Sequence, residues 1–409
     1  MTAARPLSDR RMALLLAAMS AVMPFSIDAY LPAVTEMAAA LAVGEADIQT
    51  NLSLFLIGQS LGVLVGGAWS DWSGRRRVAL SGLLLYCLAS LGLVLLDSLN
   101  QFLLLRLVQA VGAGMVAVIS GAVVRDLYEG RQAAQMFALI GVIMMAAPLL
   151  APMIGWLMLL IGGWRAVFVF LLLYAAAVWL MQWRFLPAVR PASAPAGSAV
   201  AVIAGRYRRV FGTPEALGFL LFQAFSFSSM FAFLTESPYV YMSLYGMDKG
   251  IYALVFALNI VTMTLFNRLT ALRLRRGSEP AHILLAGIGV QFAANAALVV
   301  LTQLAALPPA ALLVGLVMLS VGAQGLITAN TQACFMQHFP HEGGSANGVL
   351  LSSQALVAAA VGFATTRLHD GSAQIMPLMM LAASVCGALL LFCLSRQAFR
   401  QPRRTRQAT

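Results

Sequence analysis

Long apolar runs of about twenty residues, separated by short polar breaks, recur along the whole chain. A run of that length crosses the ~30 Å hydrocarbon core of a bilayer as an α-helix, whose backbone polar groups pair within the segment. The runs predict twelve membrane helices, at residues 12–34, 48–69, 78–96, 101–123, 133–160, 165–186, 216–241, 250–271, 281–304, 310–331, 346–367 and 375–395. With 61% apolar residues, the chain is expected to be an all-α polytopic membrane protein.

Basic residues gather at alternate breaks between these runs. The opposite breaks carry only Arg165, Lys249 and Arg367. Because Lys and Arg mark the cytoplasmic side of membrane helices, the pattern predicts that both termini are cytoplasmic. The net charge of +11 then reflects orientation in the membrane, and we expect no nucleic-acid partner.

Residues 187–214 form the longest break and are rich in Pro, Ala, Ser and Arg, a composition typical of a flexible linker. Six predicted helices precede this linker and six follow it. We therefore expect an N-terminal six-helix bundle at 1–186 and a C-terminal bundle with a basic tail at 215–409.

Asp28 and Arg106 stand inside predicted membrane helices, where a charge costs ~2.5–3.5 kcal/mol on insertion scales. At about 1.5 Å per helical residue, the two lie at a similar depth below the outer surface. Arg106 keeps its charge when buried and must find acceptors, so it could meet Asp28 directly or through water. We expect both to act in proton coupling or substrate binding, with a structural ion pair as the alternative. Gln109 shares the helix face of Arg106.

The break after the second predicted helix reads Gly67-Ala-Trp-Ser-Asp71-Trp-Ser-Gly74-Arg75-Arg76-Arg77. An acid, a turn-forming glycine and basic residues at a helix end can latch neighbouring helices. The spacing resembles the signature loop of the major facilitator superfamily, although Trp72 replaces a basic residue and Ala79 a leucine. We expect Gly67, Asp71, Gly74, Arg75 and Arg76 to form a conformational latch; the alternative is that the basic residues only anchor topology.

Other segments also resemble this superfamily. Arg106-Leu-Val-Gln109 is similar to its arginine-and-glutamine motif, and Pro148, Pro152 and Gly155 fall in a segment similar to its antiporter motif, with three motif glycines replaced. Four pieces resemble the bicyclomycin and chloramphenicol resistance (Bcr/CflA) drug-efflux subfamily: Ser26–Pro32, Phe225–Phe227, Ser237-Pro238 and Phe256–Ile260. The resemblance implies a cavity lined by the first, fourth, seventh and tenth helices, and it adds Tyr30 and Asn259 as candidate site residues.

The seventh and tenth predicted helices carry further candidates for a substrate or proton site. Glu236 lies near the outer end of the seventh, and an aromatic stripe suited to apolar ligands runs back from it through Phe233, Ser229, Phe225 and Phe222. If Pro238 ends this helix, Glu236 is instead solvated. Ser320 and Gln324 form a polar stripe that either lines a cavity or joins helices. In the second helix, Gly58, Gly62 and Gly66 form a smooth face for close packing.

The sequence contains no phosphate-binding loop with lysine, no nucleophile elbow and no metal-ligand spacing. We therefore expect neither an enzyme nor a bound cofactor or metal, so uphill transport would draw on an ion gradient. The prediction is a monomeric, proton-coupled exporter of small amphipathic drugs or metabolites in the bacterial inner membrane, working by alternating access. A proton symporter that imports a metabolite and a non-transporting receptor or scaffold remain as alternatives, and the charge of the substrate is left open.

Overall fold

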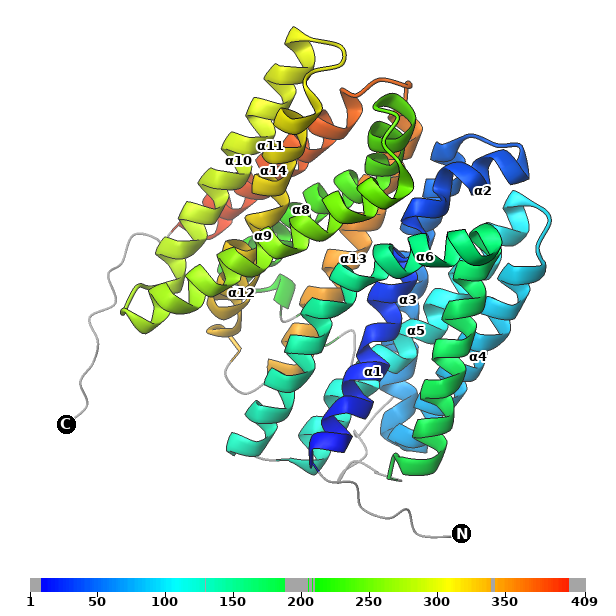
Figure 1. Ribbon diagram of the computed structural model, residues 1–409. Coiled ribbons are helices and arrows are strands. Elements are labelled where there is room, and N and C mark those ends of the chain that lie inside the picture. Colours follow the sequence, from blue (N-terminus) through cyan, green and yellow to red (C-terminus); the bar gives the residue numbers. More distant parts are fainter. Residues whose placement is uncertain are drawn as a thin grey trace. The chain divides into compact units, whose positions relative to one another are not determined.

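The computed structural model describes residues 9–128, 130–187, 205, 208, 210–339 and 343–396, which form helices and turns without a strand (Figure 1). In chain order, the elements are α1 (Asp9–Asp28), η1 (Leu31–Ala33), α2 (Val34–Leu41), α3 (Glu45–Ser73), α4 (Arg75–Leu95), α5 (Leu99–Leu127), α6 (Gly130–Phe185), α8 (Pro214–Pro238), η2 (Tyr239–Leu244), α9 (Lys249–Arg275), α10 (Pro280–Leu304), α11 (Ala310–Gly322), α12 (Gln324–Met336), α13 (Gly343–Leu368) and α14 (Ile375–Leu394). The predicted linker at 187–214 lies mostly outside the described residues.

Eleven helical segments among the described residues are long and apolar enough to cross a membrane. The all-helical membrane fold expected from the apolar runs is therefore confirmed. The predicted helices at 133–160 and 165–186 are joined in α6, which is 56 residues long. Its backbone leaves the helical conformation at Gly162 and Gly163, where Gly163 has a φ of 65°, and Figure 1 shows the chain reversing direction there.

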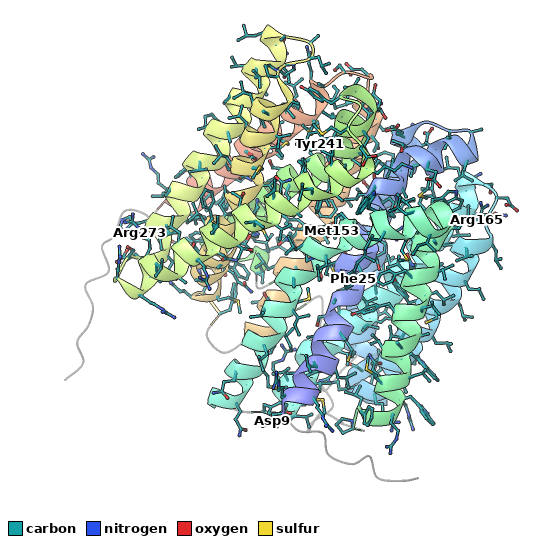
Figure 2. The ribbon with its side chains drawn as sticks, viewed as in Figure 1. Asp9, Phe25, Met153, Arg165, Tyr241 and Arg273 are labelled. Carbon is teal, nitrogen blue, oxygen red and sulfur yellow. The ribbon has the colours of Figure 1, made fainter. Side chains whose placement is uncertain are left out.

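The chain divides into two compact units that do not follow the order of the sequence. The first comprises residues 1–199, 234–261 and 362–375, and the second comprises 200–233, 262–361 and 376–409. The first unit thus combines α1 to α6 with the end of α8, η2, the first half of α9 and the end of α13. Within this unit, Asp9 and Arg165 lie at opposite ends of the helices (Figure 2).

The glycines of α3 bring this helix against the backbone of α5. A Cβ atom added to Gly62 would lie 2.1 Å from the carbonyl oxygen of Val111, and one added to Gly58 would lie 2.5 Å from that of Leu107. One added to Gly66 would lie 2.8 Å from the Cα of Met115. The predicted packing face is confirmed, since any larger side chain there would push the two helices apart.

The core of the second unit is apolar and draws on five helices. Its buried members include Phe219 and Phe222 of α8, Leu284 of α10, Phe335 of α12, Val349 of α13 and Leu391 of α14. Packing of this kind fixes the helices that carry the polar side chains of the second unit.

Candidate functional site

Arg106 is completely shielded from solvent, and each of its three nitrogens has its own acceptor. Nε donates to Oδ1 of Asn51 at 2.9 Å, Nη1 to Oε1 of Gln109 at 2.7 Å, and Nη2 to the main-chain oxygen of Ser26 at 2.9 Å. Ser26 lies in the last turn of α1, where carbonyl groups lack a partner within the helix. The end of α1 therefore offers Arg106 an acceptor that needs no particular side chain.

Two aromatic rings and a chain of hydrogen bonds complete this network. The guanidinium carbon of Arg106 lies 4.7 Å from the ring centroid of Tyr30 and 4.6 Å from that of Phe55, distances typical of cation–π contacts. The Tyr30 hydroxyl accepts from Nδ2 of Asn51 at 2.9 Å and donates to Oε1 of Gln49 at 3.0 Å. Each of these groups around the Arg106 guanidinium is thus neutral.

Asp28 is the last residue of α1 and is 5% exposed. Within the part of the chain that the structure describes, no hydrogen bond or ion pair reaches its carboxyl group, and none joins it to Arg106. Tyr252 of α9, in the same unit, lies within electrostatic range of it. Arg106 binds Ser26 two residues before Asp28, which agrees with the inferred similar depth; of the two contacts left open, the direct one does not occur among the described residues.

The segment with Pro148, Pro152 and Gly155 packs against the residues that follow Asp28. A Cβ atom added to Gly155 would lie 1.8 Å from the carbonyl oxygen of Ala29, so the two backbones touch. Both prolines lie inside α6, whose backbone stays helical past them. In this structure Gly155 therefore fixes where α6 crosses α1.

The expected latch between α3 and α4 is centred on Arg75. Its Nε atom lies 2.8 Å from Oδ2 of Asp126 at the end of α5, and Nη1 donates to Oγ of Ser70 at 2.5 Å. Gly74 has a φ of 92°, which favours glycine and lets α4 begin directly after α3. Arg76 donates to the main-chain oxygen of Trp183 in α6.

Gly67 and Asp71 are the other two residues of the expected latch. The main-chain oxygen of Gly67 accepts from Oγ of Ser70 at 2.8 Å, and the side chain of Asp71 lies outside what the structure describes. Asp126, which was not predicted from the sequence, forms an ion pair with Arg75.

Ser320 and Gln324 join helices in the second unit. Ser320 donates to Oδ1 of Asn295 at 2.6 Å, and Nδ2 of Asn295 donates to the hydroxyls of Ser229 and Ser384 at 3.1 and 2.7 Å. Nε2 of Gln324 donates to the main-chain oxygen of Ser226 in α8 at 2.7 Å. Of the two roles left open for this stripe, the contacts favour the joining of α8, α10, α11, α12 and α14.

The aromatic stripe of α8 is divided between the core and its surroundings. Phe222 and Phe233 are each 1% exposed, and Phe222 belongs to the apolar core of the second unit, whereas Phe225 is half-buried. Asn259 of α9 is buried in the first unit; its Nδ2 donates to the carbonyl of Val255 at 3.1 Å, but its Oδ1 has no partner among the described residues. Phe225 and Asn259 therefore keep surface or hydrogen-bonding capacity for a ligand.

Glu236 is 2% exposed and binds a histidine. Its Oε2 atom lies 3.0 Å from Nδ1 of His369, which follows α13. The helical path continues past Pro238 as the π-helical turn η2, so Glu236 is not solvated. His369 had not been predicted, because it lies in a polar break and pairs only through the fold.

Asn51 and Asn295 were also missed as site residues. Both stand inside apolar runs, so the rule that drew attention to Asp28 would have found them. No group of three or more metal-binding side chains occurs among the described residues.

The packed apolar helices and their buried polar centres define a polytopic α-helical membrane protein. Comparison with known proteins narrows this class. Residues 14–363 match the family model "Major Facilitator Superfamily". The bicyclomycin resistance protein homolog of Haemophilus influenzae is 29% identical over 382 residues, covering 93% of this chain and 95% of that protein. A chloramphenicol resistance protein of Pseudomonas aeruginosa is 33% identical over 299 residues, covering 72% of this chain and 69% of that protein.

A solved structure shows the same fold. The crystal structure of a D-xylose-proton symporter superposes with a TM-score of 0.73 at 15% sequence identity, covering 92% of this chain and 96% of the symporter. The chain belongs to the major facilitator superfamily, in which its relatives are of the Bcr/CflA type. It is therefore a membrane transporter and not an enzyme.

Proposed function

We propose that this transporter exports small amphipathic drugs or metabolites in exchange for protons across the bacterial inner membrane. The curated relatives named for bicyclomycin and chloramphenicol resistance support drugs as substrates. The observation that carries proton coupling is the buried carboxyl group of Asp28, which has no hydrogen bond or ion pair among the described residues.

Asp28 and Arg106 have separate roles in this proposal. The hydrogen bonds of Arg106 are taken by Asn51, Gln109 and Ser26, so its charge does not depend on Asp28. A carboxylate shielded from water without a donor costs several kcal/mol, whereas the neutral acid costs much less. Asp28 can therefore hold a proton in this conformation without disturbing the Arg106 network, and we expect release in a conformation in which water reaches its carboxyl group.

We further propose twelve membrane helices with both termini in the cytoplasm. At about 1.5 Å per residue, the 56 residues of α6 would extend roughly 80 Å, far beyond the ~30 Å hydrocarbon core. The interruption at Gly162 and Gly163 supports two spans within α6. With the eleven apolar segments, this division restores six helices before residue 187 and six after it. Transport by alternating movement of the two bundles follows from that organisation.

The test is Asp28→Asn, which keeps the size of the side chain but cannot ionise. In everted membrane vesicles with an imposed proton gradient, we expect this variant to bind chloramphenicol but to lose gradient-driven transport. Asp97→Asn is the matched control. The Asp97 side chain is 89% exposed, so this substitution should leave transport unchanged. Wild-type, gradient-dependent transport by Asp28→Asn would contradict the coupling role.

A further inference from the structure

Three titratable side chains from separate elements lie within electrostatic range of one another in the first unit. They are Glu45 at the start of α3, Glu236 near the end of α8, and His369 after α13. The histidine ring binds Glu236 through Nδ1 at 3.0 Å and leaves 17% of its side chain exposed. The break that holds His369 faces the same side as Lys249 in the predicted topology, which is the outer side.

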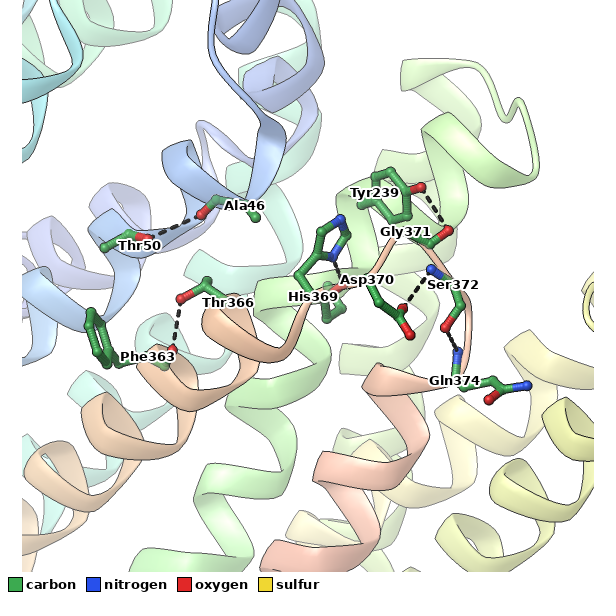
Figure 3. A network of polar contacts seen from close by, with 11 residues as sticks. Ala46, Thr50, Tyr239, Phe363, Thr366, His369, Asp370, Gly371, Ser372 and Gln374 are labelled. Atoms are coloured by element: carbon green, nitrogen blue, oxygen red, sulfur yellow. Dashed lines mark hydrogen bonds and ion pairs between the residues drawn. The ribbon is translucent and has the colours of Figure 1, made fainter.

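A polar network surrounds His369, and Figure 3 shows its part at Tyr239 and Gly371. The ring of Tyr239, the first residue of η2, meets the His369 ring edge-on at 4.5 Å between centroids. The Tyr239 hydroxyl donates to the main-chain oxygen of Gly371 at 2.9 Å. Ser243, also in η2, donates to Oε1 of Glu45 at 2.5 Å. The π-helical turn thus carries contacts to α3 on one side and to the α13–α14 connection on the other.

The charged groups that act most strongly on His369 among the described residues are negative. Glu236 on α8, Glu45 on α3 and Asp370 on its own segment lie within electrostatic range of it, and Tyr239 adds only a neutral phenol. The hydrogen bond to Glu236 raises the pKa of His369 above the ordinary 6.5; partial burial opposes the rise, and the charges of Glu236, Asp370 and Glu45 add to it. Oε2 of Glu45 is buried and has no hydrogen bond among the described residues.

We propose that Glu45, Glu236 and His369 form a proton-binding latch at the outer end of the transporter. The latch holds its proton on His369 only while α3, α8 and the segment after α13 are together. When His369 is protonated, its positive charge pairs with Glu236 and lies within electrostatic range of Glu45. When it is neutral, the two carboxylates act on each other without that counter-charge.

The sign of the coupling follows from the direction of the shift. Since contact with Glu236 raises the pKa of His369, the closed arrangement binds the proton more tightly than any arrangement in which the elements separate. Its extra stability is complete below the ordinary pKa of histidine, and it is lost as the pH rises through the raised value. Acid on the outer side therefore closes the latch, and solution with a pH above the raised pKa of His369 releases it.

In the exchange cycle, this latch would let a proton from outside trigger closure after the drug has left. That role rests on the proposed function, whereas the proton site itself does not.

The first experiment measures the site without any transport. The chain has four histidines, so selective ¹³C labelling of their rings gives four signals, assigned with His369→Gln in protein carrying a histidine-free tag. In nanodiscs we expect His369 to titrate above 6.5 and Glu236→Gln to lower its midpoint by about one pH unit, a tenfold loss of proton affinity. Glu45→Gln should lower the midpoint by less, and it is the test variant if Glu236→Gln does not insert into the membrane. A midpoint at or below 6.5, or one that neither variant lowers, overturns the proposal.

The second experiment tests the latch in transport. The matched control is His338, whose Nε2 lies 3.3 Å from Oε2 of Glu215 in the second unit. We expect His369→Gln to flatten the dependence of export on the pH of the outer solution, while His338→Gln leaves it as in the wild type. Equal pH profiles for His369→Gln and the wild type would overturn the latch in transport. If the wild type exports no drug at all, the proposed function is contradicted, but the titration result still stands.

Discussion

The packing of α3 against α5 yields a prediction that can be worked from distances. In Gly62→Ala the new Cβ would lie 2.1 Å from the carbonyl oxygen of Val111 and 3.0 Å from the amide nitrogen of Met115. Ordinary van der Waals contact begins at 3.4 Å. Both close atoms belong to the backbone of α5, so no side-chain rotation can relieve the overlap, and the helices must separate by roughly 1 Å.

The cost of that separation combines the local clash with weaker van der Waals packing along the rest of the helix pair. Overpacking of this kind costs about 1–3 kcal/mol, and we expect the upper part of that range because backbone yields least. Replacing glycine by alanine inside a helix returns about 0.5–1 kcal/mol, so the net loss should be about 1–2 kcal/mol.

Gly67→Ala is the control for this prediction. It lies on the same helix, and its new Cβ would meet only a methyl group of Val118 at 3.7 Å. The same gain in helix propensity applies, so the difference between the variants isolates the steric term. Thermal unfolding followed by tryptophan fluorescence in detergent should place Gly62→Ala several degrees below Gly67→Ala. Equal midpoints would refute the inferred contact between the two backbones.

Other perturbations test the remaining parts of the structure. Arg106→Lys keeps the charge but cannot serve three acceptors in one plane, so we expect a loss of about 2–5 kcal/mol in the same thermal assay; an unchanged midpoint would contradict the network. Asn295→Ala removes an acceptor and an NH2 group that has three acceptors within bonding distance in the second unit, and a loss below ~1 kcal/mol would contradict its joining role. Glu36→Gln breaks the 2.8 Å ion pair with Lys249 but can still accept from the Trp164 amide. Because both charged side chains are about one-third exposed, the substitution should lower stability by less than ~1 kcal/mol. A larger loss would contradict this degree of exposure.

The fold could be predicted well because the sequence features that specify it are local. Apolar length alone locates a membrane helix, and the glycine spacing of α3 already defines a smooth face. The break in α6 was also predictable, since a single helix of that length does not fit a bilayer.

The sequence supplied candidate site residues but not the contacts between them. A buried arginine must have acceptors, yet nothing local indicates that Asn51 on α3 and the main chain of Ser26 provide them. The depth comparison put Asp28 near Arg106, which binds the main chain of Ser26 two residues earlier, but depth does not specify the direction in which a side chain points. His369 shows the same limit, because its partner Glu236 lies 133 positions away in the sequence.

The central claim is exchange of a drug for a proton, and one flux measurement tests it most directly. Purified protein is reconstituted into liposomes with a pH-sensitive dye inside and no imposed gradient, and chloramphenicol is added outside. We predict that drug entry drives protons out, so the lumen becomes alkaline, and that Asp28→Asn liposomes show no such change. Acidification of the lumen, or drug entry without any proton movement that depends on Asp28, would contradict the claim.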